Sequence, residues 1–185
     1  MNELEKLCRQ AYGAYEYLRD HDLSAESGTS KRLRSGDLAQ LRTRLAEELA
    51  ELRGVVDGSH SHEGFEKDIV LEGYEVWYWA ASLMTAQGFS YAQTQPHLSF
   101  EAGFKHPAAS REELRNFALS LGKQIGEEPT TKEVAIGVFN WALYFVGKAC
   151  ALNQTAPARL LERDVAEMRQ KTYLADYWQQ VNVAI

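Results

Sequence analysis

Residues 38–56 read LAQLRTRLAEELAELRGVV, and this stretch decides the fold class. Its apolar residues recur at steps of three and four, at Leu38, Leu41, Leu45, Leu49, Leu52 and Val56. This is the period of an α-helix that buries one face. The spacing therefore predicts a helix that begins near Ser35 or Asp37 and ends near Val56.

The same periodicity elsewhere predicts an all-α protein. Besides the stretch above, helical segments are expected over roughly residues 2–21, 65–87, 110–125, 130–153 and 157–180. Ser110 and Thr130 are each followed three residues later by Glu, which marks two helix starts as capping boxes. Residues 22–36 and 89–109 are expected to be irregular, and no segment alternates like a strand. We predict a single helical-bundle domain over residues 1–185.

The composition argues against several classes of protein. The chain has 185 residues, 45% of them apolar, which is enough for one core. Its net charge of −6 and lack of a basic stripe argue against a partner of duplex nucleic acid. Cys8 and Cys150 lie outside any CxxC pattern, which indicates a reducing compartment, and no apolar leader opens the chain. A cytoplasmic location is expected.

The longest apolar run, residues 134–152, raises the question of a membrane span. Asn140 and Lys148 interrupt it. A spanning helix needs about 20 apolar residues with few or no charges. The run therefore predicts a buried helix, and no membrane partner is expected.

Two acidic stretches, EELAE at 47–51 and EGYE at 72–75, lie on consecutive predicted helices. Glu48 and Glu51 are three residues apart, as are Glu72 and Glu75, so each pair shares one helix face. Asp68 lies one turn earlier on the second face. A short loop over residues 57–64 makes the helices antiparallel neighbours. Glu51 and Glu72 then differ in height by roughly one helical turn or less.

Carboxylates gathered in this way repel one another, so their pKa values rise or a cation neutralises them. Oxygen ligands of this kind suit Mg²⁺, Mn²⁺ or Ca²⁺. Two other interpretations stay open. EELAE also suits a solvated helix face, and Arg44 or Arg53 could neutralise the acids as structural salt bridges. The apolar surroundings of EGYE make a solvated face harder to accept for Glu72 and Glu75.

EELAE resembles the E-E-x-x-E motif of the all-α nucleoside triphosphate pyrophosphatases, the group of MazG, phosphoribosyl-ATP pyrophosphatase and the dimeric dUTPases. Glu72-Gly73-Tyr74-Glu75 stands where that group has its second motif, E-x-x-D. The residues that follow, VWYWAASLMTAQGFS, resemble the aliphatic and aromatic continuation of MazG-like chains. The resemblance covers roughly residues 35–90.

The resemblance implies a fold, a reaction and a set of site residues. It implies a four-helix MazG-like core with additional C-terminal helices, assembled as a homodimer or a higher homo-oligomer. Glu48, Glu51, Glu72 and Glu75 would bind Mg²⁺, with Mn²⁺ as an alternative, and Glu47 would be a further ligand or orient the attacking water. The implied reaction is hydrolysis of a nucleoside triphosphate or related nucleotide to the monophosphate and pyrophosphate.

One departure keeps a second function open. The last acid is Glu75, where the group has Asp, and its side chain is longer by one methylene. This motivates the alternative of a non-catalytic module that binds a nucleotide or a protein and retains the scaffold. A purely structural helical assembly is a third interpretation.

Other residues are candidates for contact with a substrate. Positive charges at Lys31, Arg32, Arg34 and Lys171 are candidates to bind phosphates, and Trp79 is a candidate to stack on a base. His60, His62 and Glu66 have a loose metal-ligand spacing. Their Gly- and Ser-rich loop favours exposure to solvent instead.

Overall fold

A computed structural model describes residues 1–106, 108 and 110–183, and every regular element in this part of the chain is a helix. The helices are α1 Glu3–Asp20, α2 Gly28–Ser35, α3 Leu38–Asp57, α4 Phe65–Ala86, α5 Tyr91–Thr94, α6 Pro96–Lys105, α7 Arg111–Gly126, α8 Lys132–Leu152, α9 Ala158–Arg169, the 3₁₀ helix η1 Thr172–Leu174 and α10 Ala175–Val183. The predicted all-α fold is confirmed.

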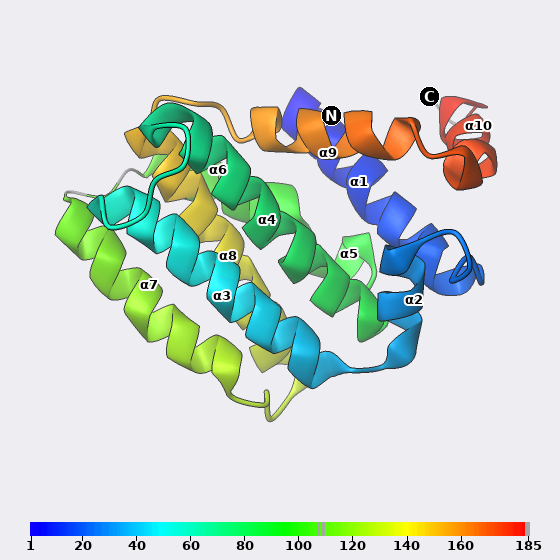
Figure 1. Ribbon diagram of the computed structural model, residues 1–185, viewed down its shortest axis with the longest axis horizontal. Coiled ribbons are helices and arrows are strands. Elements are labelled where there is room, and N and C mark those ends of the chain that lie inside the picture. Colours follow the sequence, from blue (N-terminus) through cyan, green and yellow to red (C-terminus); the bar gives the residue numbers. More distant parts are fainter. Residues whose placement is uncertain (107, 109, 184–185) are drawn as a thin grey trace.

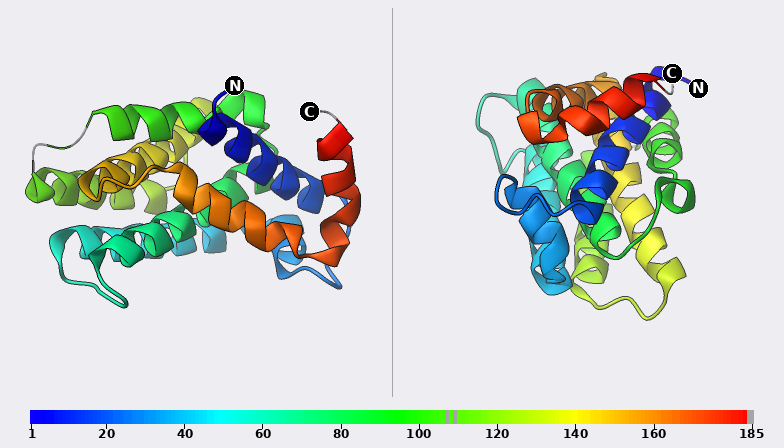
Figure 2. Two further views of the ribbon diagram at one scale, coloured as in Figure 1. Left: turned by 90° about the horizontal axis from the view of Figure 1, so that it is seen from above. Right: turned by 90° about the vertical axis from the view of Figure 1, so that its right-hand side faces the viewer.

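The long helices lie side by side (Figure 1). Helix α3 packs against α4 on one side and α7 on the other, and α8 packs against α4, α6 and α7. Helices α1 and α9 pack on each other and on α4 across one end of this group, and α10 returns to α1 (Figure 2). The loop that joins α3 to α4, residues 58–64, lies at one end of the long helices (Figure 1).

Helix α8 lies in the core of the protein. By length and composition alone it could cross a membrane, but 56% of its most apolar 18-residue window is buried inside the protein. Core helices of soluble proteins pass the same test. Within it, the Lys148 ammonium donates a hydrogen bond of 2.6 Å to the carbonyl oxygen of His106. This hydrogen bond gives the ammonium of Lys148 a partner, whereas the side-chain oxygen of Asn140, the other polar interruption, is buried without one in the described part of the chain.

The predicted helix ends agree with the structure in most places. Asp37 caps α3 by accepting a hydrogen bond from the backbone N–H three residues later, at 2.9 Å. Ser110 caps α7 in the same way, at 3.1 Å. At α8 the cap is Thr131 and not the expected Thr130, with a distance of 3.3 Å. Gly88, with φ of +81°, follows the end of α4.

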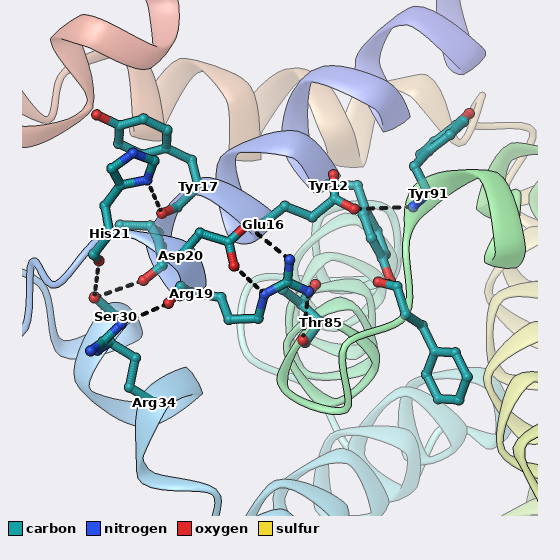
Figure 3. A network of polar contacts seen from close by, with 12 residues as sticks. Tyr12, Glu16, Tyr17, Arg19, Asp20, His21, Ser30, Arg34, Thr85 and Tyr91 are labelled. Carbon is teal, nitrogen blue, oxygen red and sulfur yellow. Dashed lines mark hydrogen bonds and ion pairs between the residues drawn. The ribbon is translucent and has the colours of Figure 1, made fainter.

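Residues 22–36 were expected to be a loop, and this expectation is wrong for the segment that forms α2. Ser27 caps the helix by accepting from the N–H of Ser30. The hydroxyl of Ser30 donates back to the carbonyl oxygen of Leu18 at 2.8 Å, and Leu33 is buried against the core. Figure 3 shows two more links of α2 to the end of α1, from Ser30 to the carbonyl oxygen of His21 and from Arg34 to that of Arg19. Tertiary contacts therefore stabilise a short helix whose sequence is mostly polar.

Two further predicted boundaries are wrong. The expected irregular connection over 89–109 contains α5 and α6, while its residues 107 and 109 lie outside the described part of the chain. The single helix expected over 157–180 is divided into α9, η1 and α10. The Trp178 indole donates to the carbonyl oxygen of Met168 at 3.2 Å, and Tyr177 donates to that of Gln10 at 2.6 Å. These contacts hold α10 in a different direction from α9.

Glycines set the close crossing of α6 and α8. A Cβ at Gly147 would lie 2.3 Å from the carbonyl oxygen of Phe100, and one at Gly103 would lie 2.1 Å from that of Tyr144. Because these neighbours are backbone atoms, they cannot move aside alone. The crossing therefore needs residues without side chains at both positions.

We predict that Gly147→Ala lowers the free energy of unfolding by ~1–3 kcal/mol, because α6 must move away from α8. Gly137→Ala, in the same helix, is the matched control, since its Cβ would meet nothing within 4 Å. There alanine should be neutral or stabilise by up to about 1 kcal/mol, through its helix propensity. Urea denaturation of both variants measures the difference, and equal stabilities would contradict this account of the crossing.

Candidate metal centre

The α3–α4 hairpin brings Glu51 and Glu72 together, as the register of the two helices predicts. With His60 and His62 from the connecting loop, they offer four ligand atoms that all lie within 4.8 Å of one another. The Nε2 of His60 lies 3.8 Å from a Glu51 carboxylate oxygen and 3.6 Å from one of Glu72. The Nε2 of His62 lies 3.5 Å from the same Glu72 oxygen. Two carboxylates and two imidazoles therefore converge on one point.

The two histidines are the site residues that the sequence analysis set aside. They were expected to be exposed, and 51% of the His62 side chain is indeed exposed, but both rings face Glu72. Glu66, their expected companion, is exposed and does not belong to the group. The sequence contains part of the information needed to place these histidines at the site, because the hairpin that aligns Glu51 and Glu72 also places its connecting loop at the same end.

Asp68 fixes the conformation of this loop. Its carboxylate accepts hydrogen bonds from the backbone N–H groups of His62, Glu63 and Gly64 at 2.8, 2.9 and 3.2 Å, and from the hydroxyl of Ser61 at 3.1 Å. Burial acts to raise the pKa of Asp68, but these hydrogen bonds together outweigh it and lower the pKa. The residue that the sequence placed on the acidic face thus organises the loop.

Close packing against α3 positions the other end of the loop. The N–H of His60 donates to the carbonyl oxygen of Gly54 at 3.0 Å. A Cβ at Gly54 would lie 2.6 Å from the Cβ of His60, which is inside van der Waals contact. The absence of a side chain at Gly54 therefore lets His60 lie directly against the helix.

Burial raises the pKa values of three acids on the two helices, and neighbouring carboxylates add to the rise. Burial is the largest cause for Glu48, whose pKa rises to about 7, with Arg44 acting against it and Glu51, Glu75 and Glu72 adding to the rise. Burial also raises the pKa of Glu72, again with Glu51 contributing. Glu75 is raised by burial against the charge of Arg163. Mutual repulsion of this kind favours protons or a cation.

Arg44 neutralises part of the acidic set. Its guanidinium forms ion pairs with both Glu47 and Glu48. Glu47 is about half exposed and does not belong to the histidine–glutamate group, so its predicted role as ligand or base stays a prediction. Arg53, the other expected neutralising residue, lines the groove between α3 and α7 with Ala50 and Lys123.

The expected phosphate-binding residues of α2 separate into two groups. Arg32 points toward α4, where it donates to the Tyr78 hydroxyl and lies 4.9 Å from the centre of the Trp79 ring. Arg34 instead donates to the carbonyl oxygen of Arg19, and Lys31 is exposed. Only Arg32 of these three contacts the aromatic residues that follow the second acidic stretch.

Trp79 was expected to stack on a base, and the structure argues against this role. The indole is only 8% exposed. The guanidinium groups of Arg32 and Arg44 lie 4.9 and 5.1 Å from its ring centre. Trp79 therefore positions two arginines beside the acidic faces.

A cavity of about 290 Å³ opens beside Glu75. Lys171, the remaining predicted phosphate-binding residue, lines it together with Tyr74, Tyr78 and Asp164. A chamber of this kind suits part of a small ligand. Its lining places Asp164 and Lys171 of the C-terminal segment in the same cavity as Glu75 of α4.

Asp164 is a buried acid that the sequence analysis missed. It accepts from the Tyr15 hydroxyl at 2.9 Å and from the Trp77 indole at 2.7 Å, which ties α9 to α1 and α4. Burial raises its pKa to about 7, against the effect of these two hydrogen bonds. No local pattern marks it, because its partners lie far away in the sequence.

The chain matches no model of a known protein family, no curated protein and no solved structure.

We predict that the metal-free protein becomes less stable as the pH rises from about 5 to about 8. The pKa of Glu48 is about 7 in the folded protein against an ordinary value of 4.5, so the folded state binds more protons than the unfolded state in this interval. The free energy of unfolding therefore falls with rising pH, and this contribution is lost as the pH passes 7. Asp164 acts in the same direction.

Urea denaturation in EDTA at several pH values measures this dependence. Glu48→Gln should weaken it, because the amide does not titrate, whereas Glu66→Gln, at an exposed position, should leave it unchanged. Stability that rises over this interval would contradict the sign.

Proposed function

We propose that the protein is a divalent-metal-dependent hydrolase that converts a nucleoside triphosphate, or a related nucleotide, to the monophosphate and pyrophosphate. One observation carries the proposal: carboxylate oxygens of Glu51 on α3 and Glu72 on α4 converge, within a group of ligand atoms that all lie within 4.8 Å of one another, and burial and the Glu51 charge raise the pKa of Glu72. Such a set is stabilised by a cation and is suited to bind one against phosphate oxygens. The resemblance to the all-α pyrophosphatases supports the same reaction, with the chain as a divergent member.

Glu51 and Glu72 are the carboxylates whose oxygens lie close enough together to bind one metal ion, whereas Glu48 and Glu75, which the resemblance also implies as ligands, lie outside this group. When bound, the ion would offset the charge that develops on the transferred phosphoryl group. Glu48 is the best candidate to accept the proton of the attacking water, because a pKa of about 7 matches that task near neutral pH. Glu47, which the sequence suggested for this role, is about half exposed, whereas Glu48 is buried, and Arg44 pairs with both.

Basic groups lie on two sides of the acidic faces. Arg32 and Arg44 flank Trp79, and Lys171 lines the cavity beside Glu75. In the proposed complex the arginines contact phosphates, and the cavity beside Glu75, which the half-buried Tyr78 helps to line, takes the nucleoside. A homodimeric assembly and a cytoplasmic location remain part of the proposal.

The ion pairs of Arg44 favour a second candidate function. Because Arg44 already neutralises Glu47 and Glu48, the scaffold is also compatible with a module that binds a nucleotide or a protein without hydrolysis. This alternative predicts metal and nucleotide binding without product.

The test is incubation of the protein with Mg²⁺ or Mn²⁺ and a panel of nucleoside triphosphates, with chromatographic separation of monophosphate and pyrophosphate. We expect both products from at least one substrate. Glu72→Gln should reduce kcat by ~100-fold or more, because it removes a ligand charge. Far-UV circular dichroism should remain unchanged.

Glu66→Gln is the matched control, since it lies in the first turn of the same helix, is exposed and does not belong to the acidic group. Full activity in Glu72→Gln would contradict the assignment of ligands. Absence of product from every substrate, with metal binding intact, would favour the non-catalytic module.

A further inference from the structure

The loop histidines change the chemistry of the acidic site. A site of carboxylates alone suits hard cations such as Mg²⁺ and Ca²⁺, whereas imidazole nitrogen is a ligand for Zn²⁺, Co²⁺ and other first-row transition ions. Here His60 and His62 face the same oxygen of Glu72. The donor set at this point is therefore two nitrogens and two oxygens.

The separations between donor atoms match the edges of a coordination polyhedron. For metal–ligand bonds of about 2.0–2.1 Å, a tetrahedron has edges of about 3.3 Å. The two histidine Nε2 atoms lie 2.8 Å apart, and the distances from histidine to carboxylate are 3.5, 3.6 and 3.8 Å. The imidazole rings are perpendicular, with an interplanar angle of 86°. Small adjustments would place all four atoms around one ion.

Glu72 provides a second and independent indication of a ligand. Its side chain is only 3% exposed, and it forms no hydrogen bond within the described part of the chain. The two imidazoles are its nearest charge partners, at distances longer than a hydrogen bond. A buried carboxylate left in this state is costly, and a cation between it and the imidazole nitrogens would satisfy it.

The loop is held in position before any ion binds. Asp68 accepts three backbone hydrogen bonds at residues 62–64, and the N–H of His60 is bonded to the carbonyl oxygen of Gly54. Neither contact uses an imidazole nitrogen or an oxygen of Glu51 or Glu72. The protein therefore orders the loop without using these four donor atoms. The hydrogen bond between the two histidine Nε2 atoms, at 2.8 Å, would give way to a bound ion.

We propose that Glu51, His60, His62 and Glu72 form a mixed nitrogen–oxygen site that binds a first-row transition ion in preference to Mg²⁺. This site deepens the proposed function, and it rests on that function only for the use of the ion in catalysis. Metal binding at these four residues does not depend on the proposed reaction. Glu48 and Glu75 then remain outside this group, available to the water and the substrate.

The test uses the full-length, metal-free protein and the metals alone. Titrations with Co²⁺ and Mg²⁺ give the affinity for each ion. Calorimetry monitors the binding of both ions, and visible absorption also monitors the binding of Co²⁺. We expect Co²⁺ to bind ~100-fold or more tightly than Mg²⁺. Electron spin echo spectroscopy of the Mn²⁺-loaded protein should show coupling to ¹⁴N of histidine.

His60→Gln and His62→Gln should each weaken Co²⁺ binding by ~10-fold or more and leave the affinity for Mg²⁺ unchanged. His21→Gln is the matched control, because this histidine stacks on Tyr17 and does not belong to the group. Equal affinities for Co²⁺ and Mg²⁺, a lack of ¹⁴N coupling, or wild-type binding in both variants would overturn the inference. None of these readouts requires hydrolysis, so a failure of the proposed reaction would be seen separately.

Discussion

The burial of like charges between α3 and α4 is the constraint on which the rest of the structure depends. Glu48 and Glu72 are almost inaccessible to solvent, and burial raises the pKa of both, with Glu72 adding to the rise at Glu48. A protein uses such an arrangement only where something compensates it. Arg44 compensates one side of the group, and the imidazoles of the loop face the other. A cation bound between these two sides would complete the compensation.

The surrounding elements keep this pair of helices in register. The loop between them is anchored by Asp68, so the hairpin cannot slide without breaking its hydrogen bonds. On the opposite side, a Cβ at Gly73 would lie 2.5 Å from Leu160, which shows how closely α9 covers α4. Asp164 then ties α9 to the same helix. The C-terminal half of the chain thus supports the acidic face and encloses the cavity beside Glu75.

The sequence predicts the helices that bury an amphipathic stripe and the register of α3 and α4, because both follow from spacing alone. It does not predict α2, whose stability comes from contacts of Ser30 and Leu33 with distant residues. The break after α9 likewise depends on Tyr177 and Trp178 reaching other helices. At the site, carboxylate spacing indicates Glu51 and Glu72, whereas the orientation of His60 depends on its loop. That orientation is set by Gly54 and Asp68, which carry no ligand pattern.

We infer that the carboxylates of α3 and α4 are held together to bind a divalent cation. The most direct measurement is a crystal structure of the protein soaked in Mn²⁺, with anomalous scattering used to locate the ion. We predict an anomalous peak surrounded by Glu51, His60, His62 and Glu72, within bonding distance of the Glu72 carboxylate. If crystals soaked in saturating Mn²⁺ show no anomalous peak between the two helices, and Glu72 is paired only with protein groups, this inference is contradicted.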